Sequence, residues 1–426
     1  MNMSEVMKPR ISTQSFTSVY SQKTFGEVFG YLANNTFSRD LLSSRISSYR
    51  NVHYGDILVK YGETLDVAKD ELPFISANAI EKAKQFPLLN NGDVIIADTA
   101  EDETVGKCTE IVNVGAAKII AGLHTMACRP KEEFAPGFLG FYMNSPKYHD
   151  QLLPLMQGTK VTGVSKTAIL DTKLLYPSFE EQTDIVHFLT SLNRAISENE
   201  SEITKLQDIK KAYRSMLFPR PGEKKPRLRF KGFTEDWVTA PLSEYLSIRN
   251  DICGNDYTVN DVLSVSGDYG VVNQIAFQGR SFAGASIANY RVVNVGNVIY
   301  TKSPLKANPY GIIKAAKKEE GVVSPLYAVY NTTDKGNANF IQVFFDEEVS
   351  LNNYLRPLVN KGAKNTLLIS DATAISGMVT FPKVEEQRAI ADFFVSLDTL
   401  IQTNKRRIEQ LKHIKAACLD GMFVNA

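Results

Sequence analysis

The sequence predicts an α+β fold: two mixed α/β domains separated by two long antiparallel coiled-coil helices, in duplicated halves related by a pseudo-two-fold axis. The main observation is a 42-residue stretch that occurs twice, at residues 177–218 and 382–423. The copies align without a gap at an offset of 205 residues and are identical at 16 positions, whereas chance gives about 2 or 3 identities. Apolar residues in both copies recur with alternating steps of four and three, which is typical of helices. Between the copies, short β-like runs bounded by turn residues indicate strands.

The apolar residues of each copy form one heptad seam. They are Ile185, Leu189, Leu192, Ile196, Ile203 and Leu206 in the first copy, and Ile390, Phe394, Leu397, Ile401, Ile408 and Leu411 in the second. A helix from Glu180 to Leu217 is about 57 Å long, and the simplest cover for its apolar stripe is the other copy. The alternative, two unrelated helices packed on separate cores, is disfavoured because both copies begin with P-x-x-E-E-Q.

Both seams are interrupted at the same place, by Asn199 and by Asn404. Antiparallel pairing of equivalent helices brings their midpoints together, so these asparagines are expected to meet near the crossing. A polar pair buried in a seam fixes register, whereas the alternative is that each asparagine is exposed. The residues predicted to pair the helices are therefore Leu192, Ile196, Asn199, Ile203, Leu397, Ile401, Asn404 and Ile408.

The 205-residue offset is too long for a solenoid repeat of about 20 to 50 residues. It indicates a duplicated half made of a globular domain and a long helix, with boundaries at residues 1–176, 177–220, 221–381 and 382–426. Within the first domain, Gly55–Val59, Gly92–Ile96 and Ala117–Ile120 are predicted strands. An apolar content of 43% is sufficient for packed cores.

Composition and motifs argue against several classes of protein. The net charge of +1 argues against a surface covered with basic residues but permits local basic patches. Neither an apolar signal segment nor an 18-residue apolar run is present, so a cytoplasmic protein without membrane contact is expected. Cys108, Cys128, Cys253 and Cys418 are widely spaced and are predicted to be buried thiols. No metal or cofactor is expected.

Two fragments resemble catalytic motifs but are incomplete. Asn308-Pro309-Tyr310 lacks the second proline of the N-P-P-Y motif of amino-methyltransferases, and no glycine-rich cofactor loop precedes it. Gly106-Lys107 lacks the glycine that a phosphate-binding loop requires five residues earlier, where Glu101 stands. Neither fragment therefore supports a methyltransferase or a phosphate-binding site.

Polar loops near the ends of predicted strands are candidates for DNA contact. Lysine and serine suit phosphates, whereas asparagine and some lysines can address base edges. The alternative is that these are ordinary solvated loop residues. The candidates are Lys160, Thr162, Ser165 and Lys166 in the first domain, and Lys302, Ser303, Lys306, Asn308, Tyr310, Lys314, Lys361, Lys364 and Asn365 in the second.

The segment Pro219–Phe233 joins the first long helix to the second domain. Its prolines and glycine end the helix, and it carries six basic residues and one acidic residue. It is either a phosphate-contacting linker or a solvated hinge.

Several motifs together resemble the specificity subunits of type I restriction-modification systems. They are the P-x-x-E-E-Q openings at Pro177–Gln182 and Pro382–Gln387 with the heptad helices behind them, PRLRFKGFTEDW at Pro226–Trp237, the K-S-x-x-x-x-x-P-Y-G run at Lys302–Gly311, and VVSPLY at Val322–Tyr327. The resemblance covers both halves of the chain.

This resemblance implies a non-catalytic reader of double-stranded DNA. Residues 1–176 and 221–381 would be target-recognition domains, each reading one half of an asymmetric bipartite site. The conserved helical regions at 177–220 and 382–426 would set the spacing and dock two methyltransferase subunits, and restriction or translocase subunits would join that assembly. The alternative is a protein-binding scaffold that tethers two ligand-binding domains through a coiled coil. A complete methyltransferase is disfavoured because its cofactor motifs are missing.

Overall fold

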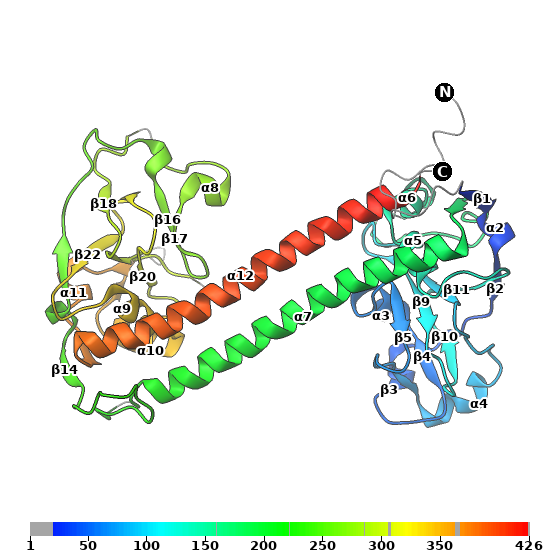
Figure 1. Ribbon diagram of the computed structural model, residues 1–426, viewed down its shortest axis with the longest axis horizontal. Helices are drawn as coiled ribbons and strands as arrows, with labels where there is room; N and C mark the ends of the chain where they lie inside the picture. The colour runs from blue at the N-terminus through cyan, green and yellow to red at the C-terminus, as the bar shows by residue number, and fades with distance from the viewer. Residues whose placement is uncertain are drawn as a thin grey trace. The chain divides into compact units, whose positions relative to one another are not determined.

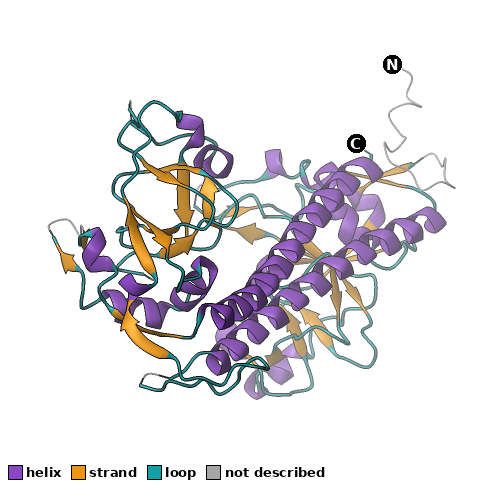
Figure 2. Cartoon of the chain, turned by 60° about the vertical axis from the view of Figure 1, so that its left-hand side comes forward, coloured by secondary structure: helices purple, strands orange, loops and turns teal. Residues whose placement is uncertain are grey.

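The computed structural model describes residues 20–158, 160–220, 222–284, 286–305, 308–362 and 367–424. The chain divides into two compact units: unit 1 contains Met1–Glu200 with Arg406–Ala426, and unit 2 contains Ser201–Lys405. Each unit combines helices and strands (Figure 1), and Figure 2 shows this mixture by secondary-structure type. The predicted α+β class is confirmed.

Two helices of 39 residues follow the repeated motif, α7 (Phe179–Leu217) and α12 (Val384–Met422). The boundaries of the units fall inside these helices, after Glu200 and after Lys405. Each unit therefore contains one part of each helix. The four segments drawn from the sequence divide the chain differently, and their boundaries stay a prediction.

Unit 1 has a five-stranded sheet and a four-stranded sheet. The larger runs in the order β2 (Phe29–Leu32), β11 (Thr125–Pro130), β7 (Val94–Ala97), β9 (Cys108–Val112), β5 (Thr64–Asp66). The smaller runs β10 (Ile119–Ala121), β4 (Arg50–Val52), β6 (Phe74–Ile75), β3 (Leu42–Ser43). Two further strand pairs are β1 (Ser21–Thr24) with β13 (Lys173–Tyr176) and β8 (Thr99–Ala100) with β12 (Thr162–Gly163). The short α-helices of this unit are α2 (Phe25–Val28), α3 (Tyr54–Val59), α4 (Ile80–Ala83), α5 (Phe138–Met143) and α6 (Pro146–His149).

Two of the three predicted strands of unit 1 are confirmed, as β7 and β10, but Gly55–Val59 is wrong because it forms helix α3. The His53 side chain caps this helix by accepting a hydrogen bond from the backbone N–H of Gly55 at 3.2 Å. Ile57 is buried whereas Val59 is 86% exposed. A short apolar run does not by itself distinguish a strand from one turn of helix.

Unit 2 has one four-stranded sheet, in the order β15 (Leu246–Arg249), β22 (Ala328–Thr332), β19 (Val298–Tyr300), β20 (Ile313–Ala315). Its two-stranded pairs are β14 (Val238–Pro241) with β25 (Met378–Phe381), β16 (Leu263–Ser266) with β17 (Gly270–Asn273), β18 (Arg291–Val293) with β21 (Gly321–Val323), and β23 (Asn360–Lys361) with β24 (Leu367–Leu368). Its short helices are α8 (Gln274–Gln278), α9 (Ala338–Phe345), α10 (Glu348–Leu355) and α11 (Asp371–Ala374).

The two units share an order of strands, although the sequences of their domains are only weakly similar. The antiparallel order β2-β11-β7-β9 in unit 1 matches β15-β22-β19-β20 in unit 2. Each unit also pairs its first strand with the strand before its long helix, as β1 with β13 and as β14 with β25. This common order supports the duplication predicted from the helices.

The P-x-x-E-E-Q motif has the same structural role in both units. The Gln182 side chain accepts a hydrogen bond from the backbone N–H of Ala135 and donates one to the Pro177 carbonyl, both at 3.0 Å. The Gln387 side chain accepts from the N–H of Asn337 at 3.0 Å and donates to the Pro382 carbonyl at 2.9 Å. Both glutamines are buried, so each one fixes the start of a long helix to its own domain.

Parts of α7 and α12 pack together inside each unit. In unit 1, Ile185 and Leu189 share an apolar core with Cys418 and Met422. In unit 2, Leu206 and Leu217 from α7 share a core with the early α12 residues that include Ile390 and Phe394. The start of one helix thus meets the end of the other, which is the predicted antiparallel sense. Both cores also contain sheet residues, so the seams pack on the domains as well.

The predicted pairing residues differ in burial. Leu192 packs against the unit 1 core, Ile203 packs against the unit 2 core, and Leu397 and Ile401 belong to the unit 2 core. Ile408 is buried, whereas Ile196 and Asn404 are half-buried. The Asn199 side chain donates to the Ala195 carbonyl of its own helix at 2.6 Å. Because Asn199 and Asn404 belong to different units, their meeting stays a prediction.

Candidate nucleic-acid interface

The first predicted loop of unit 2 leaves strand β19 and is closed at its neck by hydrogen bonds. The backbone N–H of Thr301 donates to the Ile312 carbonyl at 3.1 Å, and the Tyr300 hydroxyl donates to the Tyr310 carbonyl at 2.6 Å. Gly311 has a φ of +91°, and a Cβ there would lie 2.9 Å from the Tyr300 ring. Glycine is therefore required at the point where the loop returns to the sheet.

The predicted side chains of this loop have different environments. The Lys302 ammonium is paired with Asp371. The Ser303 hydroxyl donates to the Thr301 carbonyl at 3.2 Å. The Asn308 carbonyl oxygen Oδ1 is enclosed and has no hydrogen-bond partner among the residues that the structure describes. Lys306 lies outside the described residues.

The structure brings the second predicted loop of unit 2 against the first. Lys361 on β23 is exposed, and its Nζ lies 5.2 Å from the centroid of the Tyr310 ring. Such a cation–π contact contributes about 0.5–1 kcal/mol at exposed sites. Asp371, three residues after the end of β24, provides a second link through Lys302. Lys364 and Asn365 lie outside the described residues.

Lys314 does not belong to this surface, which corrects the sequence prediction. It lies on β20, is 8% exposed, and its Nζ forms an ion pair with Asp346 at 2.6 Å. The basic loop continues directly into a buried strand, and the partner carboxylate is 32 residues further along the chain. The sequence pattern therefore could not separate Lys314 from the loop lysines.

Sequence reasoning missed Asp371 and Arg291, which form a three-residue ion cluster with Lys302. Asp371 accepts from Lys302 on Oδ1 and from Arg291 on Oδ2. Burial alone would raise the pKa of Asp371, but the hydrogen bonds and charges of Lys302 and Arg291 hold the pKa below its usual value. No sequence spacing indicates this cluster, because its members are far apart along the chain.

The predicted loop of unit 1 begins with a tight turn that requires glycine. Gly158 has a φ of +117°, and a Cβ there would lie 2.0 Å from the Val161 carbonyl oxygen. Lys160 and Ser165 are exposed, and Thr162 is half-buried on β12. The four predicted residues thus lie on one short segment.

Lys166 joins this loop to the end of β2. Its Nζ lies 5.5 Å from the centroid of the Tyr31 ring and 3.4 Å from Oδ1 of Asn34. The Tyr31 hydroxyl in turn donates to the Lys166 carbonyl at 2.7 Å. Tyr31 and Asn34 were missed in the sequence and now belong to the candidate surface.

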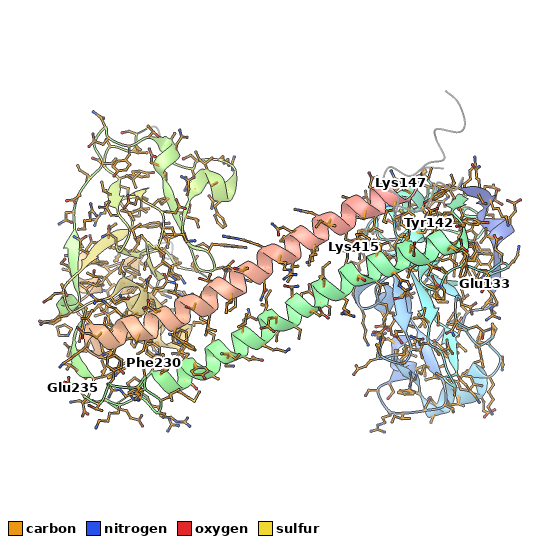
Figure 3. All side chains as sticks on the ribbon, in the orientation of Figure 1. Glu133, Tyr142, Lys147, Phe230, Glu235 and Lys415 are labelled. Atoms are coloured by element: carbon orange, nitrogen blue, oxygen red, sulfur yellow. The ribbon has the colours of Figure 1, made fainter. Side chains whose placement is uncertain are left out.

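The basic linker is anchored to the start of α12 through Arg229. The guanidinium of Arg229 forms two hydrogen bonds to Glu386, at 2.9 and 2.5 Å, and a third to the Glu235 carbonyl at 2.7 Å. Phe230 and Glu235 lie beside the start of α12 (Figure 3). The hinge interpretation fails at Arg229, whereas the exposed Arg220, Lys224, Arg227 and Lys231 leave the phosphate-contacting interpretation open.

Other chemistry is limited in the part of the chain that the structure describes. Its residues include no cluster of three or more His, Cys, Asp or Glu side chains suited to a metal ion. None of its helices is long and apolar enough to cross a membrane. The four cysteines are unpaired and buried, as predicted.

Residues 21–208 match the family model of the type I restriction modification DNA specificity domain. A relative from Methanocaldococcus jannaschii, assigned as the specificity subunit of the type I restriction enzyme MjaX, is 20% identical over 342 residues, covering 76% of each chain. The crystal structure of the S subunit of a type I restriction-modification system from M. genitalium has a TM-score of 0.61 at 10% identity, covering 99% of this chain and 100% of that chain. The HsdS subunit from Thermoanaerobacter tengcongensis has a TM-score of 0.44 at 17% identity, covering 94% and 95%.

The M. genitalium match shows a common fold, and the family model and the relative agree on the same class of protein. The resemblance predicted from the sequence motifs is confirmed. The chain is therefore similar to type I restriction-modification specificity proteins, and residues 21–208 carry the match to their DNA specificity domain.

Proposed function

We propose that this chain is a non-catalytic DNA-recognition subunit whose two target-recognition domains each read one half of an asymmetric bipartite site. The observation that carries the proposal is the meeting of two separate loops in unit 2, through Lys361 over Tyr310 and Lys302 with Asp371. The exposed cation of Lys361 lies over Tyr310, two residues after Asn308 in the first loop. Phosphate contacts by cations position a protein on DNA, whereas amide groups can read base edges.

The two half-sites should differ because the two candidate surfaces differ. Unit 1 offers Lys160, Thr162, Ser165 and Lys166, with Lys166 over Tyr31, whereas unit 2 offers two loops that meet where Lys361 lies over Tyr310. Different donors and acceptors favour different bases. An asymmetric target therefore follows from this role.

We propose further that α7 and α12 set the spacing of the half-sites and dock two methyltransferase subunits. Ile209 and Ile414 occupy equivalent positions of the two helices and are 41% and 47% exposed. An exposed isoleucine at the same position of both helices suits two copies of one partner. A restriction or translocase subunit would then join through that assembly.

The test is duplex binding as a function of salt, with the target first identified by mapping methylated bases in cells that carry this chain and its methyltransferase. Phosphate contacts release counterions, so log K should fall linearly with log salt, with a slope of about −0.9 per phosphate contacted. Specific binding with this slope supports the DNA reader. A chain that binds no duplex and shows no slope would instead support the protein scaffold.

A further inference from the structure

We propose that Asp371 is a positioning residue for DNA recognition: its carboxylate, at the start of α11, joins the loop after β19 to strand β18 and fixes the conformation in which that loop meets the duplex. This inference rests on the proposed DNA-reading function. It also changes the role of Lys302, from a phosphate contact to an anchor for the loop.

The geometry of the Asp371 carboxylate supports this role. Its two oxygens take cations from different segments, Lys302 after β19 and Arg291 on β18. The three side chains are only 12%, 16% and 20% exposed, for Asp371, Lys302 and Arg291. The Tyr330 hydroxyl donates to the Asp371 carbonyl at 2.9 Å. Both the backbone and the side chain of Asp371 are therefore fixed to the sheet.

Lys302 supports the same role through its backbone conformation. Its φ of +49° is in the left-handed region, which is uncommon for a residue with a side chain because the Cβ crowds the backbone. The ion pair with Asp371 stabilises this conformation at the exit of β19. A lysine held in this way is not free to follow a phosphate.

The negative charge of Asp371 makes the positioning role testable. A carboxylate near DNA repels phosphates, so on charge alone Asp371 weakens binding, and its removal should tighten it. Removing one partner of a buried ion cluster, however, leaves the other charges uncompensated and disturbs the structure that they hold. Charge repulsion alone therefore predicts tighter DNA binding by Asp371→Asn, whereas the positioning role predicts weaker binding.

The experiment uses the full chain with its methyltransferase subunits and measures affinity of Asp371→Asn for three duplexes: the mapped target, the target with a scrambled first half-site, and the target with a scrambled second half-site. We expect affinity for the target to fall at least tenfold. We expect little change for the duplex with the scrambled second half-site, because only recognition of that half-site is lost. The salt slope should not change, since no phosphate contact is removed.

The matched control is Asp346→Asn, which breaks the Lys314–Asp346 ion pair in the same unit, where the carboxylate is 14% exposed. It should leave discrimination of the second half-site intact. If Asp371→Asn folds poorly, Lys302→Met tests the same ion cluster from the other partner. It should reproduce the loss without reducing the salt slope, and the double variant should lose no more than either single one.

Tighter binding of Asp371→Asn to all three duplexes would show a purely electrostatic role and overturn the inference. Unchanged discrimination, an equal loss in Asp346→Asn, or a salt slope reduced by about one in Lys302→Met would also overturn it. A wild-type chain that fails to distinguish any duplex would instead refute the proposed function itself.

Discussion

Gln182 and Gln387 lie 205 residues apart in sequence, and each donates a hydrogen bond to the proline carbonyl that opens its motif, at 3.0 and 2.9 Å. Each also accepts a backbone N–H from a loop of its own domain. The motif persists in both halves because these bonds tie a long helix to a domain, whatever that domain recognises.

Gln387→Leu should destabilise the chain by about 2–4 kcal/mol, because it leaves a buried backbone N–H and buried carbonyls without partners. Urea unfolding followed by circular dichroism measures this loss. Gln410→Leu, an exposed glutamine on the same helix, is the control and should change stability by less than about 0.5 kcal/mol. Equal effects of the two substitutions would contradict the role assigned to Gln387.

Glu110 should make stability depend on pH. It is 1% exposed, and it accepts hydrogen bonds from the N–H groups of Gly137 at 2.7 Å and Gly140 at 3.0 Å. Burial raises the pKa of Glu110 from 4.5 to about 7, although these hydrogen bonds oppose the rise. The neutral acid therefore makes its full contribution to stability below pH 4.5. This contribution, about 3 kcal/mol in total, is lost as pH rises to 7.

Glu110→Gln should therefore flatten the decline in unfolding free energy between pH 5 and pH 7.5, measured with urea. Glu63→Gln is the control. Burial opposes ionisation of Glu63, but Lys415 lowers its pKa overall, so its contribution is lost only as pH falls below about 4.5. A pH profile of Glu110→Gln that matches wild type would contradict the assignment.

Asn199 and Asn404 should lie close enough for a disulfide when both are replaced by cysteine, if the helix midpoints meet. A disulfide needs Cα atoms about 4.4–6.8 Å apart. Mild oxidation followed by non-reducing electrophoresis of a proteolysed sample detects the crosslink. Asn199→Cys with Leu411→Cys, one heptad away, is the control. Efficient crosslinking of the control and not of the first pair would place the crossing elsewhere.

Insertion of one heptad into both helices, between Ile196 and Ile203 and between Ile401 and Ile408, should change the preferred gap between half-sites. The insertion preserves the seam and adds about 10 Å, which corresponds to about three base pairs. Three base pairs also turn DNA by roughly 100°, so affinity for the original site should fall. Competition among duplexes of graded gap measures the preference, and an unchanged gap at unchanged affinity would leave the helices as a docking surface only.

Ile209→Asp and Ile414→Asp should each weaken association with one of two methyltransferase subunits, and the double variant should lose both. Their exposed apolar side chains are replaced by charges that resist burial. The mass of the complex measures the stoichiometry. Gln207→Asp, an exposed substitution on α7, is the control, and full assembly of the double variant would place docking elsewhere.

The long helices could be predicted to within a few residues because heptad periodicity is a local pattern that 39 residues repeat many times. The predicted strand at Gly55–Val59 failed because five residues carry too little periodicity, and the capping by His53 decides the outcome. The two loops of unit 2 were predicted separately, and their meeting was not predicted. Asp371 could not be found, since it lies 69 residues from Lys302 and only the tertiary fold joins them.

The packing of α12 into unit 1 has a consequence for synthesis on the ribosome. Phe423 contacts the rings of Phe138 and Tyr142, at centroid distances of 5.9 and 5.3 Å, and the Tyr20 hydroxyl donates to the Met422 carbonyl at 2.7 Å. All of Ser201–Lys405 must be translated before these partners emerge, which takes about 10–40 seconds at about 5–20 residues per second. During that interval the aromatic face of the first domain is uncovered, so the nascent chain should be a chaperone substrate until its last helix is made.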